Sequence, residues 1–291
     1  MPDVEATPHK EPRILTAQES IHELGSRGKL PSILGIWRLG KILRQSHRSW
    51  ISLGQPADAI DSPKWDYVIK TFSPSMNPWE VKRQVSQVTA LSKVVAHPNL
   101  VSTVDASATA NTPYLVMPRL EAISMEQMLL SGETKPLAIT LWITRQVAEA
   151  LDAIHQTGWI HGNVTPSHIL LSSNGHTTLI DVGMSQKIHT FNPQNDAIDR
   201  RFASPESLSG NLAAMAAMDI FSLGRVLWQW LTVTIPENRA ILEPVVDLVE
   251  AMVSPEPNER PEAASVVKEL KQLEFFVLGK HIGPSGCLQA A

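Results

Sequence analysis

The chain has 291 residues and a mass of 32.0 kDa, enough for one large domain or two small ones with a sizeable buried core. Hydrophobic residues make up 43% and charged residues 19%, which is typical of globular proteins and argues against wholesale disorder. The formal net charge of −4 gives no overall field for nucleic acid or anionic lipid, so we expect neither as a partner. The single cysteine, Cys287, excludes an internal disulfide and a cysteine-based metal site.

The sequence predicts a cytoplasmic protein without a membrane span. Its first residues, MPDVEATPHKEPR, lack the apolar core of a signal peptide. The most apolar long stretch, residues 212–231, is interrupted by Asp219 and Arg225.

Residues 1–33 are predicted to be a partly disordered N-terminal extension. Residues 1–15 are polar and lack periodicity. Thr16 and Glu19 match a capping box, which predicts a short helix that ends near Gly25.

Residues 34–118 are predicted to form a small lobe, with mostly short strands. Apolar runs alternate with Pro, Gly or Asn, which predicts an antiparallel sheet. These runs are ILGIWRLGKIL, SWISLG, WDYVIKTF, LVSTVDAS and TPYLVMP. One helix is expected from about Pro78 to Val95, where apolar residues recur at spacings of three and four.

Residues 119–275 are predicted to form a larger, mostly helical lobe, followed by a tail over 276–291. The stretch 137–157 is apolar nearly all round, which is typical of a buried helix. Further helices are expected near 217–233, 241–253 and 262–275. The predicted fold class is therefore α+β, with two lobes that meet near residue 118.

Six separated segments stand in one order along the chain. They are YVIK ending at Lys70, HGNVTPSH at 161–168, DVG at 181–183, SPE at 204–206, DIFSLG at 219–224 and NERP at 258–261. Together they resemble the protein kinase family, and SPE followed by SL looks most like bacterial-type Ser/Thr kinases. The resemblance implies a bilobal fold, with a β-rich lobe that carries one helix and a larger α-helical lobe.

The resemblance also implies ATP and Mg²⁺ as cofactors and assigns candidate residues to them. The candidate nucleotide-binding residues are Ile51, Lys70, Met117, Leu120, Leu170 and Asp181. Asp181 stands at one metal-ligand position and His168 at the other. Fold-stabilising roles are implied for His161, Glu206, Asp219 and Arg260. Asp181 has a second interpretation, because Asp-x-Gly after a strand also forms simple turns.

Several positions depart from the family pattern. Asn163 replaces the catalytic aspartate, and a neutral amide cannot accept the proton of a substrate hydroxyl. His168 replaces an asparagine, although Mg²⁺ prefers oxygen ligands. The three phosphate-loop glycine positions hold Arg44, Ser46 and Ser49.

Two further positions lose a charge. Counting back from His97-Pro98-Asn99, the helix glutamate that should pair with Lys70 falls on Val88, or on Gln87 if the helix has one more residue. Gly162 replaces the arginine that commonly reads a phosphorylated activation segment.

These departures predict a pseudokinase, a protein-binding or regulatory module whose phosphoryl transfer is lost or very weak. The expected partner is a protein, such as another kinase or a signalling protein. Two alternatives remain open: a weak or unconventional ATP-dependent Ser/Thr kinase that uses Lys70 and Asp181, and a nucleotide sensor that binds ATP without chemistry.

Overall fold

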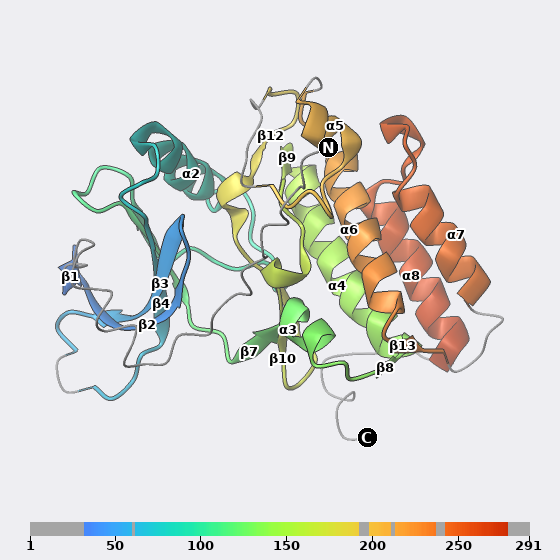
Figure 1. Ribbon diagram of the computed structural model, residues 1–291, viewed down its shortest axis with the longest axis horizontal. Helices are drawn as coiled ribbons and strands as arrows, with labels where there is room; N and C mark the ends of the chain where they lie inside the picture. The colour runs from blue at the N-terminus through green and yellow to red at the C-terminus, as the bar shows by residue number, and fades with distance from the viewer. Residues whose placement is uncertain (1–31, 60–61, 192–197, 211–212, 237–241, 279–291) are drawn as a thin grey trace, which may run out of the picture.

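The computed structural model describes residues 32–59, 62–191, 198–210, 213–236 and 242–278. A lobe built on a β-sheet stands beside a larger helical lobe (Figure 1). The expected α+β bilobal fold is therefore confirmed. The helix predicted to begin at Thr16 and most of the predicted tail lie outside the described residues. The predicted lobe boundaries at 34, 118 and 275 stay predictions.

A six-stranded antiparallel sheet forms the small lobe, in the order β1-β2-β3-β4-β6-β5. Its strands are β1 (Ile33–Leu34), β2 (Trp37–Gln45), β3 (Ser49–Pro56), β4 (Tyr67–Phe72), β5 (Asp105–Ser107) and β6 (Tyr114–Pro118). In register, Lys70 of β4 lies between Ile51 of β3 and Leu115 of β6. The strand pairing thus fixes Lys70 near the middle of the sheet.

The helix of the small lobe is α2 (Pro78–Leu91). Asn77 caps its first turn by accepting a 2.9 Å hydrogen bond from the Trp79 amide, and Pro78 occupies the first helical position. Its apolar face is buried, including Val88. The helix ends at Leu91, four residues before the predicted end at Val95, because the chain turns after Ser92.

Six helices are described in the large lobe. They are α3 (Met125–Leu130), α4 (Leu137–Gln156), α5 (Pro205–Ser209), α6 (Ala216–Leu231), α7 (Leu242–Met252) and, at the end of the described chain, α8 (Ala263–Leu278). α4 lies beside α6 and α8 in Figure 1, and its side chains are buried nearly all round, as its sequence predicts. No described helix has both the length and the apolar character needed to cross a lipid bilayer.

Short strands and 3₁₀ turns complete the described part of the large lobe. The strands are β7 (Ala122–Ser124), β8 (Lys135–Pro136), β9 (Trp159–Ile160), β10 (Ile169–Ser172), β11 (Thr177–Leu179), β12 (Gln186–Lys187) and β13 (Thr234–Ile235). The 3₁₀ turns are η1 (Pro166–His168), η2 (Val182–Met184) and η4 (Pro257–Glu259). β10 pairs with β7 and β11, and β9 pairs with β12. These pairs place residues 161–168 and 181–184 at the boundary between the lobes.

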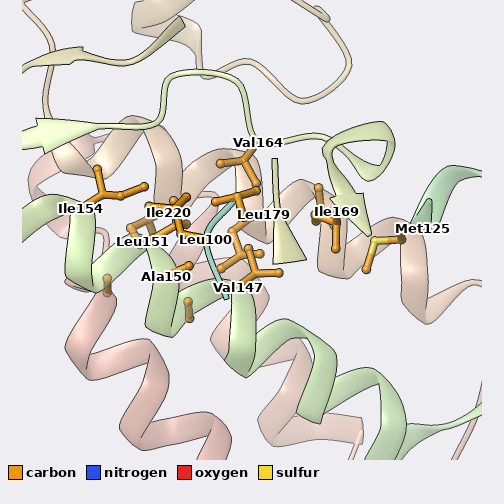
Figure 2. Close-up of a cluster of buried hydrophobic side chains, with 14 of the residues drawn as sticks. Leu100, Met125, Val147, Ala150, Leu151, Ile154, Val164, Ile169, Leu179 and Ile220 are labelled. Carbon is orange, nitrogen blue, oxygen red and sulfur yellow. The ribbon is translucent and has the colours of Figure 1, made fainter. Parts of the chain in front are cut away.

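The main apolar core lies between α4 and the short strands that face the small lobe. Figure 2 shows Val147 and Leu151 of α4 beside Leu179 of β11, with Ile220 of α6 close by. Each of these side chains is buried. Burial of this kind is the main favourable contribution to folding, so the segments that flank the lobe boundary rest on a rigid base.

A buried ion pair also holds the large lobe together. Arg260 donates to Glu206 through both terminal nitrogens, at 2.6 and 3.0 Å. It also donates to three backbone carbonyls and lies over the Phe221 ring at 4.9 Å. Hydrogen bonds from Arg260 lower the pKa of Glu206 against the opposing effect of burial. The pair therefore links α5, α6 and the segment before α8.

Replacing Glu206 by Gln should lower the free energy of unfolding by about 3–5 kcal/mol, because Arg260 would stay buried without a counter-charge. The double change Glu206→Leu with Arg260→Met should cost less than the single change, since it leaves no charge in the interior. Urea unfolding measures both values.

The control is the exposed pair of Asp199 and Arg201, in which the arginine side chain is 67% exposed. Asp199→Asn should change the free energy of unfolding by less than about 1 kcal/mol. A loss in Glu206→Gln as small as the loss in this control would contradict the assigned role of the buried pair.

Candidate active-site cleft

A cleft of about 880 Å³ lies between the two lobes. Its walls come from β2, β3, β4 and β6, from α2 and α3, and from the segments around η1 and η2. The sequence-predicted residues that line it are Ile51, Lys70, Met117, Leu120, Asn163, His168, Leu170 and Asp181. The remaining four, His161, Glu206, Asp219 and Arg260, are buried outside the cleft lining. The fold thus gathers the predicted nucleotide and metal positions in one place.

Lys70 and Asp181 form an ion pair across the cleft. The Lys70 Nζ atom lies 2.6 Å from Oδ1 of Asp181, and the lysine side chain is only 11% exposed. Asp181 follows β11 and has a backbone φ of +62°, a left-handed conformation that is uncommon outside glycine. Such backbone conformations are concentrated at functional sites. The ion pair joins the sheet of the small lobe to the large lobe.

The second oxygen of Asp181 faces a ring nitrogen of His168. Nε2 of His168 lies 3.5 Å from Oδ2, and Nδ1 of the same ring donates to the Asn163 carbonyl at 3.0 Å. His168 belongs to η1, whose first residue is Pro166. Both carboxylate oxygens of Asp181 therefore face basic groups of the protein itself.

These basic groups determine the charge state of Asp181. Burial alone would raise the pKa of its carboxyl, but the charges of Lys70 and His168 and the hydrogen bond from Lys70 outweigh burial and hold the pKa well below its ordinary value. Burial lowers the pKa of His161, whose Nε2 donates to the Ile180 carbonyl at 3.1 Å. Asp181 is thus held as a carboxylate, whereas burial disfavours the charged form of His161.

Asp219 of α6 holds the loop that carries Asn163. Its carboxylate accepts hydrogen bonds from the amides of His161 and Gly162, at 2.7 and 2.8 Å, and from Nε2 of His155 at 2.9 Å. The Asn163 amide in turn donates to Nδ1 of His161 at 3.2 Å. Hydrogen bonds from the backbone amides of residues 161–163, rather than contacts of the Asn163 side chain, therefore hold the loop in its conformation.

Gly162 is required by this loop conformation. Its φ is +76°, and a Cβ at this position would lie 2.7 Å from the carbonyl oxygen of Met184. A larger side chain here would meet both backbone strain and a steric clash. The loop is therefore built for glycine and does not accommodate an arginine in its present shape.

The turn of the β2–β3 hairpin, which lines the cleft, is held by hydrogen bonds among its own residues. The Ser46 hydroxyl accepts hydrogen bonds from the amides of Arg48 and Ser49, at 3.2 and 3.0 Å, and the Ser46 amide donates to the Ser49 carbonyl at 2.9 Å. Arg48 forms an ion pair with Glu80 of α2. These amides are therefore satisfied inside the turn, and the turn is tied to the helix.

The α2 residue beside the ion pair is Gln84, not Val88 or Gln87. A Cβ added to Gly183 would lie 3.2 Å from Oδ1 of Asp181, 3.3 Å from Oε1 of Gln84 and 4.0 Å from Nζ of Lys70. Gln87 points elsewhere, since its Oε1 accepts from Arg83. The count from His97 therefore did not point to Gln84, and its assignment of the glutamate position to Val88 or Gln87 stays a prediction.

Sequence reasoning missed Gln84, although the sequence holds a signal for it. Glu80 and Gln84 are four residues apart on one face of α2, and Nε2 of Gln84 donates to Oε1 of Glu80 at 3.3 Å. With Arg48 on the other side of Glu80, a polar chain runs from the hairpin along α2 toward Asp181. The end of this chain that approaches Asp181 is therefore the neutral amide of Gln84.

Residues 59–241 match the family model of the protein kinase domain. This chain belongs to the protein kinase family. The match covers more than half of the chain, so the family predicted from the sequence is confirmed.

Individual relatives are distant. The chain is 27% identical over 234 residues to the serine/threonine-protein kinase PknK of Mycobacterium tuberculosis, a match over 71% of this chain and 21% of that protein. It is 28% identical over 147 residues to the probable serine/threonine-protein kinase PknB of Lactococcus lactis, over 49% and 23% of the two chains. A probable inactive serine/threonine-protein kinase of Dictyostelium discoideum is 22% identical over 283 residues, covering 79% and 23%. The chain spans less than a quarter of the length of these relatives.

Active kinases use ATP with Mg²⁺. The side chains that line the cleft can therefore be compared with the ligands that Mg²⁺ prefers. Mg²⁺ requires several oxygen ligands in near-octahedral geometry. Here both oxygens of Asp181 face Lys70 and His168, and His168 offers nitrogen where oxygen is needed. The described residues contain no group of three or more His, Cys, Asp or Glu side chains that could hold a metal ion. The side chains of this cleft do not fit Mg²⁺ in the arrangement observed.

The paired state of Asp181 should appear in the pH dependence of stability. Because its folded pKa is lowered, the carboxylate stabilises the fold above the unfolded pKa of about 3.9, and this contribution is lost as the pH falls below it. The difference in free energy of unfolding between the wild-type chain and Asp181→Asn should therefore be constant down to about pH 5 and shrink from about pH 4 to pH 3.

Urea unfolding at a series of pH values measures this difference, with Asp199→Asn as a second carboxylate variant outside the cleft. A difference that is unchanged at about pH 3 would show that Asp181 gains no stabilisation from Lys70 and His168.

Proposed function

We propose that this chain is a pseudokinase, a regulatory module that binds another protein and does not transfer phosphate at a useful rate. The observation that carries the proposal is the state of Asp181. The metal-ligand carboxylate of the family motif is engaged by Lys70 at 2.6 Å and faces His168 at 3.5 Å. Two groups that an active kinase directs at nucleotide and metal therefore bind each other here.

The surrounding replacements support the same conclusion. Asn163 has no carboxylate at the position of the catalytic base, and a positioned base typically contributes about 10²–10⁴-fold to rate. The hairpin amides at Arg48 and Ser49 are already bonded to Ser46, so they are not directed at phosphates. These losses act on one transition state, so their effects compound without being strictly additive.

The remaining contacts favour a scaffold role. The Lys70–Asp181 pair and the Arg48–Glu80 pair connect the sheet, the helix of the small lobe and the large lobe. They need no ligand to form, so they hold the lobes in one arrangement that a partner protein can recognise. Another kinase or signalling protein in the cytoplasm is the kind of partner that we propose.

One observation favours a second function, that of a nucleotide sensor. The cleft volume of about 880 Å³ falls within the range of small-molecule sites, and the lining includes Lys70 and the apolar residues Ile51, Met117 and Leu170. ATP binding would then have to separate Lys70 from Asp181. A weak kinase would also have to separate Lys70 from Asp181. In addition, it would need a base that accepts the proton of the substrate hydroxyl.

Phosphoryl transfer is the direct test. The wild-type chain should incorporate no more γ-labelled phosphate, into itself or into casein, than Lys70→Met and Asp181→Asn, because the base position holds Asn163. Radiolabel counting after gel separation measures the transfer, and circular dichroism confirms that each variant is folded. Incorporation by the wild-type chain that vanishes in both variants would establish the weak-kinase alternative instead.

A thermal-unfolding titration with ATP tests the conclusion about Mg²⁺. Saturation at about 100 times the dissociation constant stabilises a protein by about 2.7 kcal/mol, a shift of several degrees. We expect that any shift caused by ATP is the same in EDTA and in Mg²⁺, because the oxygens of Asp181 are engaged.

The control for this titration is Lys70→Met, which removes the cation of the cleft. A shift that requires Mg²⁺ and disappears in Asp181→Asn would contradict the conclusion that the cleft does not fit the metal. A shift that depends on Lys70 alone would favour the sensor over the scaffold.

A further inference from the structure

Another hollow lies outside the cleft, and its lining residues come from α2, β9, β12 and the segment after β12. Figure 1 shows where these elements lie. Its volume is about 230 Å³. We call it the α2 groove, and the residues that line it are Trp79, Arg83, Gln87, Trp159, Gln186, Lys187, Thr190 and Phe191. The cleft lining includes none of these residues, and none of them lies in the six motif segments.

The α2 groove is a local positive site in a chain of net charge −4. Two of its lining residues, Arg83 and Lys187, are cationic, and none is acidic. Each cation lies against an aromatic ring: Arg83 is 5.8 Å from the ring centre of Trp79, and Lys187 is 5.9 Å from that of Trp159. The rings position both cations at the walls of the groove.

Arg83 keeps a hydrogen-bond donor that nothing satisfies. Its Nη1 donates to Gln87 at 3.2 Å, but its Nε is buried and has no hydrogen-bond partner within the described ranges. Burial lowers the pKa of this guanidinium, and the charge of Glu80 offsets only part of that effect. A buried donor without a partner is unfavourable. Because this Nε is closed to solvent, the groove offers an anion the charge of Arg83 rather than a hydrogen bond from Nε.

Two large apolar rings border the same cations. Trp79 is 65% exposed and Phe191 is 73% exposed. Exposed aromatic residues beside an arginine are the combination that dominates binding energy at protein interfaces. The α2 groove therefore combines an anion site with an apolar anchor site.

We propose that the α2 groove binds an acidic segment of a partner protein. A carboxylate of that segment pairs with the guanidinium charge of Arg83 and lies near the ammonium of Lys187, and an adjacent apolar side chain packs on Trp79 and Phe191. A carboxylate fits better than a phosphate, because one nitrogen of Arg83 is already bonded to Gln87. Nucleic acid does not fit, because two cations give too few phosphate contacts.

This inference names the partner class of the proposed regulatory module, and in that respect it rests on the proposed function. The binding itself does not depend on the loss of phosphoryl transfer. Measured phosphate transfer would overturn the proposed function and leave the α2 groove intact, whereas a groove that binds no acidic segment would leave the transfer assay unchanged.

The test uses the full chain and an array of synthetic dodecapeptides. Each sequence carries a hydrophobic residue next to a central position that is Glu, Gln or phosphoserine. We expect the Glu form to bind at least about tenfold more tightly than the Gln form, because only the carboxylate is charged. Equal binding of the Glu and Gln forms, or no binding by any peptide, would overturn the proposal. Preference for phosphoserine over Glu would overturn the assignment to a carboxylate.

Variants then locate the site. Arg83→Gln and Lys187→Gln should each weaken binding of the selected Glu peptide by about tenfold, measured by fluorescence polarisation with melting temperatures as folding controls. Lys82→Gln removes a charge from an exposed position of α2 outside the groove and should change binding less than twofold. Equal weakening in all three variants would show nonspecific attraction, and no weakening in Arg83→Gln and Lys187→Gln would place the peptide elsewhere.

The indole N–H signals of the tryptophans give an independent readout in a ¹⁵N-labelled chain. Trp79→Phe identifies the signal of Trp79, and the selected peptide should shift that signal. A peptide that binds without moving it would contradict the proposed anchor.

Discussion

The buried carboxylate of Asp219 is the interaction on which the cleft depends. It accepts two backbone amides of the loop at 161–162 and the ring of His155, so it joins α6, α4 and the loop. Burial raises the pKa of this carboxyl, but the hydrogen bonds and the nearby histidines outweigh burial and keep the pKa low. Because these contacts use backbone groups, the loop keeps its shape when the side chain at Asn163 is not an acid. The fold can therefore persist without the chemistry that the family usually places on it.

Lys70 and Asp181 show how residues of a catalytic motif take a structural role. In their present contact each satisfies the charge of the other, and both are mostly shielded from solvent. His168 adds to this arrangement by contacting Asp181 through one nitrogen and the Asn163 carbonyl through the other. Survival of these two motif residues is thus compatible with loss of transfer, because the same charges that bind a nucleotide also hold the lobes together.

Local sequence patterns predicted the positions of residues that lie in a strand or directly after one. Lys70 lies in a strand, and Asp181 follows one, so motif spacing was enough to place both in the cleft. Gln84 was missed because its approach to Asp181 comes from the packing of α2 against η2, two elements that are far apart in the chain. The ion pair of Arg48 with Glu80 also lay beyond prediction, since the two residues are 32 positions apart and meet only when the hairpin folds over the helix. Tertiary contacts of this kind leave no periodic signal in a sequence.

The cleft and the α2 groove differ in how their cations are paired with negative charge. In the cleft, Lys70 already has Asp181 as its counter-charge, so an anionic ligand must first displace a carboxylate that is held in place. In the α2 groove, no acidic residue lines the wall beside Arg83 and Lys187, so an anionic group does not have to displace a carboxylate of the lining. Binding free energy is the surplus over the contacts that must be broken. On that ground an anionic ligand meets less competition beside α2 than in the cleft, and this distribution of charge supports the regulatory role that we propose for this kinase fold.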